Sequence, residues 1–280
     1  MYVRPASIED ALDRLGAGAR LLAGGTDLMV GGDEAGFRGD LVDISRLPEL
    51  RGIARADGEW RIGGATSWSE IASADLPPAF AALQAAAREV GSVQIQNRGT
   101  VAGNLCNASP AADGVPALLA LDACVELVSR RGVRRLPLAN FLTGPRRTEL
   151  AAGEILFAVV CPAPPATMRS AFLKLGARRY LVISIAMVAV ALDIERETVR
   201  EARVAVGACS PVAMRLPDAE RRLVGPARAG LGEALRSQDF EALAPIDDLR
   251  ASAGYRRAAA LTLTRRAAEL CLKGERGGAV

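Results

Sequence analysis

Two segments of the chain combine glycines with hydroxyl, amide and carboxylate side chains, a combination suited to binding phosphate groups. The first segment consists of Ala23, Gly24, Gly25, Thr26, Asp27 and Leu28. Because glycine has no Cβ, a ligand can approach the backbone and successive N–H groups can surround an anion. A helical turn starting near Leu28 would add the partial positive charge of its N-terminus. We predict a phosphate-binding turn here, and an ordinary tight turn after a strand is the alternative.

The second segment, residues 96–113, contains Thr100, Gly103 and Asn104 and ends at Asp113. The threonine hydroxyl and the amide could bind a ligand, and the Asp113 carboxylate could accept hydrogen bonds from ligand hydroxyls. The alternative is an Ω-type loop that satisfies its own backbone. A predicted hairpin and helix separate the two segments in the sequence. One extended diphosphate ligand, held between the two segments, would explain why the chain contains both of them.

The glycine spacing differs from two common nucleotide-binding motifs. Gly16 and Gly18 supply the first two glycines of GxGxxG, but Leu21 replaces the third, and the glycines follow a predicted helix rather than a strand. The sequence also contains no GxxxxGK[ST] loop. We therefore expect any phosphate to be held in a different way.

Lysine is nearly absent from the sequence. Lys174 and Lys273 are the two lysines among 35 basic residues, and Lys174 lies on a predicted strand. A compact ammonium suits a point contact where a forked guanidinium would not fit. A surface lysine is the alternative.

The composition excludes several classes of protein. The chain has 280 residues, a formal charge of +3 and 50% hydrophobic residues, which indicates a sizeable core and no electrostatic footprint for nucleic acid or membrane. It has no histidine, which excludes the Ser/His/Asp triad, the Cys/His pair and most zinc-enzyme designs. We predict no catalytic side chain and no metal site, and expect a tightly bound organic cofactor instead.

The cysteines and apolar runs indicate a cytoplasmic protein. Five cysteines occur without any CxxC spacing, and we interpret them as buried free thiols. The N-terminus shows no signal-peptide pattern. The longest apolar run, residues 180–192, is too short for a membrane span of about 20 residues and predicts buried strand.

Hydrophobic periodicity and turn residues predict the elements that position these segments. Helices are expected at residues 8–15, 77–90, 115–121, 231–243 and 250–272, with a further helix capped by Thr66 or Ser67. Strands are expected at residues 20–22, 41–44, 50–55, 60–64, 125–128, 133–136, 155–160, 171–175, 183–192 and 199–207. The prolines at positions 162, 164 and 165 predict a domain boundary.

The two segments, in this order and ending in residues 108–113, resemble the FAD-binding medium subunit of molybdenum hydroxylases, the family of xanthine dehydrogenase and carbon monoxide dehydrogenase. Residues 250–257 resemble the segment that opens the last helix of that subunit. The resemblance implies an α+β fold with a two-lobed FAD-binding domain of the PCMH type at residues 1–165, the lobes being about 1–55 and 56–165. A C-terminal domain, residues 166–280, would contain a small antiparallel sheet packed on helices.

The resemblance also implies roles for individual residues in binding FAD. Residues 23–28 would hold the pyrophosphate through backbone N–H groups, and Thr100, Gly103 and Asn104 would line its other side. Asp113 would meet the ribityl or pyrophosphate region, Leu156 would pack near the adenine, and Lys174 would contact FAD.

Two positions depart from relatives of known type. Thr26 and Asp27 stand where carbon monoxide dehydrogenases tend to have His-Ser, which makes the chain more similar to xanthine and aldehyde dehydrogenases. Residues 180–183 read Tyr-Leu-Val-Ile where many relatives have an aspartate close to the flavin. The electron acceptor therefore stays open among NAD, oxygen, a quinone and a cytochrome.

In function, the resemblance implies an electron-transfer subunit of a molybdenum hydroxylase complex. Electrons would come from the [2Fe–2S] clusters of a small partner subunit, after substrate oxidation on a large molybdopterin-binding subunit, and would pass through FAD to NAD or another acceptor. The cysteine pattern for such a cluster is absent from this chain. The alternatives are a standalone flavin oxidoreductase and a flavin-free assembly scaffold, and for the substrate class, carbon monoxide or an aldehyde.

Overall fold

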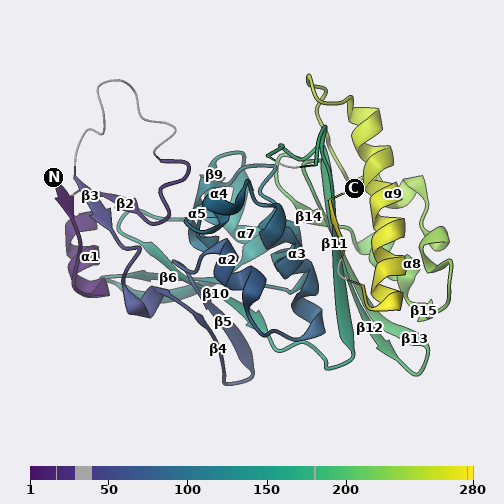
Figure 1. Cartoon of the computed structure of the whole chain (residues 1–280), viewed down its shortest axis with the longest axis horizontal. Helices are drawn as coiled ribbons and strands as arrows, with labels where there is room; N and C mark the ends of the chain where they lie inside the picture. Colours follow the sequence, from purple (N-terminus) through teal and green to yellow (C-terminus); the bar gives the residue numbers. More distant parts are fainter. Residues whose placement is uncertain (17, 29–39, 180, 276, 280) are drawn as a thin grey trace.

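The elements follow one another along the long axis of the molecule, from a small N-terminal lobe to a C-terminal sheet covered by a long helix (Figure 1). The computed structural model describes residues 1–16, 18–28, 40–179, 181–275 and 277–279. The helical segment expected after Leu28, and Tyr180, therefore lie outside the described residues. The architecture is α+β, as predicted from the resemblance.

The first lobe packs one helix on a parallel sheet with the strand order β1-β3-β2. Its elements are β1 (Tyr2–Val3), α1 (Ile8–Gly16), β2 (Arg20–Leu22), β3 (Leu41–Asp43) and the short helix η1 (Pro48–Leu50). Ser7 Oγ accepts a hydrogen bond from Asp10 N at 3.2 Å, which starts α1 where the sequence predicts. Strand β2 ends at Leu22, so the sheet directs the chain into residues 23–28.

The second lobe is an antiparallel sheet with the order β4-β5-β10-β6-β7, covered by short helices. Its strands are β4 (Ile53–Ala56), β5 (Glu59–Gly63), β6 (Cys124–Ser129), β7 (Gly132–Pro137) and β10 (Ile155–Pro162), with a separate hairpin of β8 (Leu142–Gly144) and β9 (Arg147–Thr148). Its helices are α2 (Trp68–Ser73), η2 (Pro78–Phe80), α3 (Ala81–Glu89), α4 (Val93–Gln96), α5 (Val101–Asn107), α6 (Gly114–Ala120) and α7 (Leu138–Phe141).

Local sequence signals account for two of these junctions. Asp57 and Gly58 have φ values of 52° and 76° and form the hairpin turn between β4 and β5. Ser67 caps α2, and Glu70 returns the bond to the Ser67 backbone, so a complete capping box starts this helix.

The C-terminal part is a sheet with the order β14-β13-β12-β11-β16, and both faces of this sheet are buried. Its elements are β11 (Met168–Leu175), β12 (Ala186–Glu195), β13 (Thr198–Gly207), β14 (Met214–Arg215), α8 (Pro217–Leu223), β15 (Gly225–Pro226), η3 (Leu231–Ala234), η4 (Ser237–Phe240), α9 (Ala253–Lys273) and β16 (Gly277–Ala279). Helix α9 covers one face of the sheet (Figure 1).

Strand β12 divides its side chains between two hydrophobic cores. Met187, Ala189 and Ala191 pack with α3 and α6 of the second lobe, and the alternating residues Val188 and Val190 pack with α9 and its neighbours. This alternation follows from the two-residue period of a strand and explains why the segment reads as a continuous apolar run. The predicted boundary at residue 165 stays a prediction, because one core extends across it.

Strand β11 also caps both ends of α3. Ser170 Oγ accepts a hydrogen bond from Ala82 N at 2.8 Å and donates one to Ala79 O at 2.7 Å. Four residues further along the same strand, Lys174 Nζ donates to Glu89 O at 3.1 Å. Four strand residues and a nine-residue helix are both roughly 13 Å long, so one strand reaches both helix termini.

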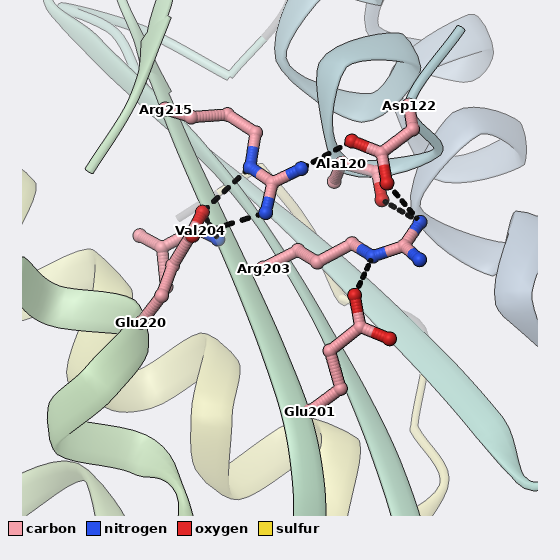
Figure 2. Close-up of polar contacts among 7 residues, drawn as sticks. All are labelled: Ala120, Asp122, Glu201, Arg203, Val204, Arg215 and Glu220. Carbon is pink, nitrogen blue, oxygen red and sulfur yellow. Dashed lines mark hydrogen bonds and ion pairs between the residues drawn. The ribbon is translucent and has the colours of Figure 1, made fainter. Parts of the chain in front are cut away.

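Charged side chains join the C-terminal end of α6 to the C-terminal sheet (Figure 2). Asp122 lies 2.9 Å from Arg203 and also pairs with Arg215, while Arg203 Nη1 donates to Ala120 O at 3.3 Å. Glu220 pairs with Arg215 at 2.6 Å and accepts a bond from Val204 N at 3.0 Å. This network fixes the C-terminus of α6 against β13.

The structure differs from the predicted elements in several places. The strand predicted at residues 50–55 is preceded by η1 and begins at Ile53, and the helix predicted at residues 77–90 is divided into η2 and α3. Residues 231–243 form the short helices η3 and η4 instead of one α-helix. The reason is close packing on α9, because a Cβ on Gly232 would lie 2.6 Å from Arg265 O. The polar segment 96–113 contains the helix α5, which its composition did not indicate. Strand β12 begins at Ala186, after Ile183 and Ser184.

Candidate cofactor-binding site

A cavity of about 730 Å³, which we call the first cavity, lies between the first lobe and α5. Its volume is within the range of sites that bind small molecules and cofactors. The lining residues come from β2 and the segment after it, from α5, and from β10. They are residues 20–28, Ile44, Trp68, Val90, Ile95, Gly99, Thr100, Ala102, Gly103, Asn104, Cys106, Asn107, Leu150, Ile155 and Leu156.

Gly24 and Gly99 bring the two glycine-containing segments into contact. A Cβ on Gly24 would lie 2.1 Å from Arg98 O, so only glycine allows the backbones to approach this closely. A Cβ on Gly99 would lie 3.5 Å from Thr26 Oγ1. Gly25 has a φ of 76°, in the left-handed region that favours glycine. The two segments thus form facing walls of one cavity.

The backbone of residues 24–28 contributes a run of successive N–H groups to the cavity wall. Among the described residues, none accepts a hydrogen bond from the N–H groups of Gly24, Gly25, Thr26, Asp27 or Leu28. Most buried or half-buried N–H groups in proteins have a partner, so a cluster without one indicates a binding site for an acceptor. A turn of successive N–H groups at a cavity wall suits an anion such as a diphosphate.

On the facing wall, Asn104 is the residue with unused hydrogen-bonding capacity. Thr100 Oγ1 accepts a bond from Gly103 N at 3.1 Å, so both predicted residues serve the N-terminus of α5. Asn104 Oδ1 is buried and has no partner in the described part of the chain. A buried amide oxygen without a donor at a cavity wall indicates that a ligand supplies the donor.

Asp113 and Lys174 do not line the first cavity. They form a buried ion pair with 2.7 Å between Oδ2 and Nζ, and Ser184 Oγ donates to Asp113 Oδ1 at 2.7 Å. Burial raises the pKa of Asp113, and the Lys174 ammonium and the Ser184 hydroxyl oppose that rise. The compact ammonium makes point contacts, as the sequence predicts. Direct contact of either residue with FAD stays a prediction.

Lys174 borders a second cavity of about 330 Å³. Helix α4 and its flanks separate the two cavities, since Val90 and Ile95 line the first while Gly91 and Gln96 line the second. Ser92 lies in the wall of the second cavity, and its buried Oγ has no partner among the described atoms. A ligand longer than the first cavity would meet Lys174 only by passing this segment.

Sequence reasoning gave no role to several residues of the first cavity, and three of them make notable contacts, although Asn107 lies within the predicted segment 96–113. Trp68 packs so closely that a Cβ on Gly114 would lie 2.2 Å from its ring, and Asn107 donates to Asp27 Oδ1 at 2.8 Å. Cys106 is the third, and burial raises the pKa of its thiol to about 12, which disfavours the nucleophilic thiolate. The predicted capping box at Ser67 could have drawn attention to Trp68, the first residue of that helix. Nothing local in the sequence marks Asn107 as a partner of Asp27.

The remaining features with possible chemical roles are the cysteines, the potential metal ligands and the long helices. All five cysteines are free, and Cys161, Cys209 and Cys271 are buried. Within the described ranges, no three His, Cys, Asp or Glu side chains gather closely enough to hold a metal ion. None of the helices in those ranges is both long and apolar enough to cross a membrane.

Comparison with known sequences and structures identifies the class to which this fold and cavity belong. Residues 1–164 match the family described as FAD binding domain in molybdopterin dehydrogenase, and residues 171–270 match the CO dehydrogenase flavoprotein C-terminal domain. The chain is 35% identical over 272 residues to the xanthine dehydrogenase FAD-binding subunit of Escherichia coli O157:H7, covering 95% of this chain and 93% of that protein.

A second relative and a crystal structure extend the similarity. The chain is 33% identical to the nicotine 6-hydroxylase medium subunit of Paenarthrobacter nicotinovorans, covering 95% of this chain and 94% of the relative. It superposes with a TM-score of 0.88 on a chain of the carbon monoxide dehydrogenase from Hydrogenophaga pseudoflava that lacks the Mo-pyranopterin moiety, at 29% identity and with 98% and 97% of the two chains covered.

These matches define a flavin-binding oxidoreductase component of the α+β class. The chain belongs to the family of FAD-binding subunits of molybdenum hydroxylases.

Proposed function

We propose that the first cavity holds the adenine and diphosphate half of FAD. The observation that carries this proposal is that the N–H groups of residues 24–28 and, on the opposite wall, Asn104 Oδ1 have no hydrogen-bond partner among the described residues. Leu156 and Ile155 add an apolar surface against which the adenine would pack. Asp113 and Lys174 are also predicted to contact FAD. Lys174 lines the second cavity while 3% exposed, and Asp113 is its buried ion-pair partner, so this contact would be made by Lys174 from the second cavity.

When bound, FAD supplies the ability to accept and release electrons singly or in pairs. The chain's own residues would bind and orient the cofactor. Gly24 lets the two walls approach each other, Gly25 gives the turn its left-handed backbone, Asn104 would accept a hydrogen bond from the ligand, and Trp68 fixes the shape of the wall. This division of labour needs no histidine, in agreement with the composition.

We further propose that the chain transfers electrons within a cytoplasmic molybdenum hydroxylase complex of the xanthine dehydrogenase type. A small [2Fe–2S] subunit would supply the electrons, a large molybdopterin-binding subunit would oxidise the substrate, and NAD is the acceptor we test first. The relatives' names support this assignment, since "medium subunit" and "FAD-binding subunit" describe parts of larger enzymes. A carbon monoxide or aldehyde dehydrogenase complex is the alternative for the substrate.

Titration of the purified chain with FAD, FMN and ADP tests the cofactor proposal. We expect FAD and ADP to compete for one site and FMN to bind at least about tenfold more weakly, because FMN lacks the adenosine half. Asn104→Leu should reduce FAD affinity by about tenfold or more without lowering the melting temperature, because it removes an oxygen that is unpaired in the free chain. FMN binding as tightly as FAD, or no flavin binding, would contradict the proposal.

Co-purification of the native assembly tests the electron-transfer proposal. We expect two further subunits, and reduction of NAD when xanthine or hypoxanthine is added. Activity with carbon monoxide or an aldehyde alone would select the alternative substrate class. A chain that binds FAD but purifies alone and oxidises a small substrate would favour a standalone flavoenzyme, and one that ignores FAD would favour a scaffold.

A further inference from the structure

We propose that Asn107 and Arg146 are positioning residues, which hold the diphosphate-binding turn in place through Asp27. Neither is among the residues that the sequence singled out for binding the cofactor. The inference deepens the proposed function and rests on it, since the turn is residues 24–28 of the first cavity.

Three side chains form a continuous chain of hydrogen bonds from the turn to the β8–β9 hairpin. Asn107 Nδ2 donates to Asp27 Oδ1 at 2.8 Å. Arg146 Nη1 donates to Asn107 Oδ1 and, at 3.2 Å, to the Asn107 backbone oxygen. The residues come from three separate segments, so this chain ties the turn to the C-terminus of α5 and to the hairpin.

The donor and acceptor properties of the three side chains allow only one orientation of the Asn107 amide. A guanidinium can only donate hydrogen bonds and a carboxylate can only accept them. The amide between them must therefore turn its oxygen to Arg146 and its NH₂ group to Asp27. Arg146 thus determines which face of Asn107 meets the turn, although it does not itself line the cavity.

The backbone around the hairpin holds Arg146 in an unusual conformation. Arg146 and Ala108 have φ values of 58° and 46°, which non-glycine residues rarely adopt. Arg146 N donates to Ala108 O at 2.9 Å, so one of these residues ends α5 and the other turns the hairpin against it. Strain of this kind persists where surrounding contacts impose it and is concentrated at functional sites.

The same connection offsets the negative charge of Asp27. This carboxylate stands in a turn whose N–H groups suit an anion, where it would repel a diphosphate. It accepts a hydrogen bond from the Asn107 NH₂ group, and the Arg146 guanidinium comes next in the same chain of hydrogen bonds and adds a positive charge. The repulsion between Asp27 and a bound diphosphate is thereby reduced.

Asn107→Asp tests the connection, because it keeps the size of the side chain and replaces the donor with a second carboxylate facing Asp27. We expect FAD affinity to fall by about tenfold or more. The NMR order parameters of the backbone N–H groups of residues 24–28 should fall in the FAD-free protein, because the turn loses its support. The double variant Asn107→Asp/Asp27→Asn restores a donor–acceptor pair in reverse, and should return FAD affinity to within about threefold of the wild type and restore the order parameters.

Arg146→Met provides the second test, with Arg147→Met as its matched control on the neighbouring position of the hairpin. We expect the first variant to lower the order parameters of residues 24–28 and weaken FAD binding, and the second to do neither. The proposal is overturned if Asn107→Asp leaves the order parameters unchanged, or if the double variant is no better than the single one. Because the order parameters are measured without cofactor, they test the positioning role even if wild-type FAD binding contradicts the proposed function.

Discussion

Gly25 adopts a backbone conformation that a β-branched side chain cannot share without strain, and the position lies in the wall of the first cavity. We expect Gly25→Val to reduce FAD affinity by at least about tenfold, because it distorts the turn and places a side chain where the diphosphate approaches. Equilibrium titration with flavin fluorescence measures the effect.

Gly58 is the matched control for this substitution. It has the same φ of 76° in the β4–β5 hairpin, and a Cβ there meets nothing within 4 Å. Gly58→Val should cost about 1 kcal/mol of stability through backbone strain and leave FAD affinity unchanged. If both variants lose flavin equally, general destabilisation explains the result and the site lies elsewhere.

The sequence predicts those residues of the cofactor site that a short stretch of neighbouring residues is enough to identify. Ala23 to Leu28 are recognisable from paired glycines, and the structure places them in the cavity with Thr100, Gly103, Asn104 and Leu156. Asp113 and Lys174 are chemically conspicuous, but they lie 61 residues apart in sequence and only the fold shows that they neutralise each other. A composition cannot reveal such a pairing.

Among the elements, β11 controls the position of α3 through Ser170 and Lys174. Lys174→Met leaves the buried Asp113 carboxylate with Ser184 as its remaining hydrogen-bond donor among the described residues, and also frees the last turn of α3. We expect a loss of about 3 to 5 kcal/mol in the free energy of unfolding, measured with urea.

The double variant Lys174→Met/Asp113→Asn serves as the control for charge burial. It removes both charges, while the amide oxygen introduced at position 113 can still accept the bond from Ser184, so we expect it to be more stable than Lys174→Met alone. If the two proteins unfold at the same urea concentration, the unpaired charge is not the cause. FAD titration of the same pair tests whether Lys174 also reaches the cofactor.

Asp248 stabilises the start of α9 in a manner that depends on pH. Bonds from the Arg250 backbone, from the Arg256 side chain and from the Ala251 backbone lower the pKa of Asp248 to about 2. A lowered pKa means that the contribution is complete above the unfolded value near 4 and disappears as the pH falls through about 2. The melting temperatures of wild type and Asp248→Asn should therefore converge between about pH 4 and 2, whereas a constant difference would contradict this role.

The elements that the sequence predicts well are those whose signals are contained within them. The hairpin at Asp57 and Gly58 and the cap at Ser67 have the structure expected, and the apolar run does so from Ala186 onward. Residues 231–243 have the composition of a helix, but Gly232 must pack against the backbone of α9, and this tertiary contact selects two short helices. Helix α5 was missed because its capping threonine stands in a polar segment.

For the whole molecule, Asp122 connects the FAD-binding part to the C-terminal sheet (Figure 2). Arg203 is largely buried, whereas Asp122 is partly exposed and screened by solvent. We expect Asp122→Asn to lower the free energy of unfolding by about 1 to 2 kcal/mol, because it leaves two arginines without their shared partner. Glu195→Gln, in the exposed pair with Arg200, should change it by at most about 0.5 kcal/mol. Equal effects would mean that Figure 2 shows an ordinary surface contact.

The division of the faces of β12 between two cores has a consequence for synthesis of the protein. Helices α3 and α6 are synthesised roughly 90 to 120 residues before β12 and β13 are complete, an interval on the order of 5 to 20 s at ordinary rates of elongation. During that interval the apolar faces of α3 and α6 that later pack against β12 are not yet covered by it. Chaperones that shield emerging polypeptides therefore have a defined target on this protein, and the target vanishes when the last strands arrive.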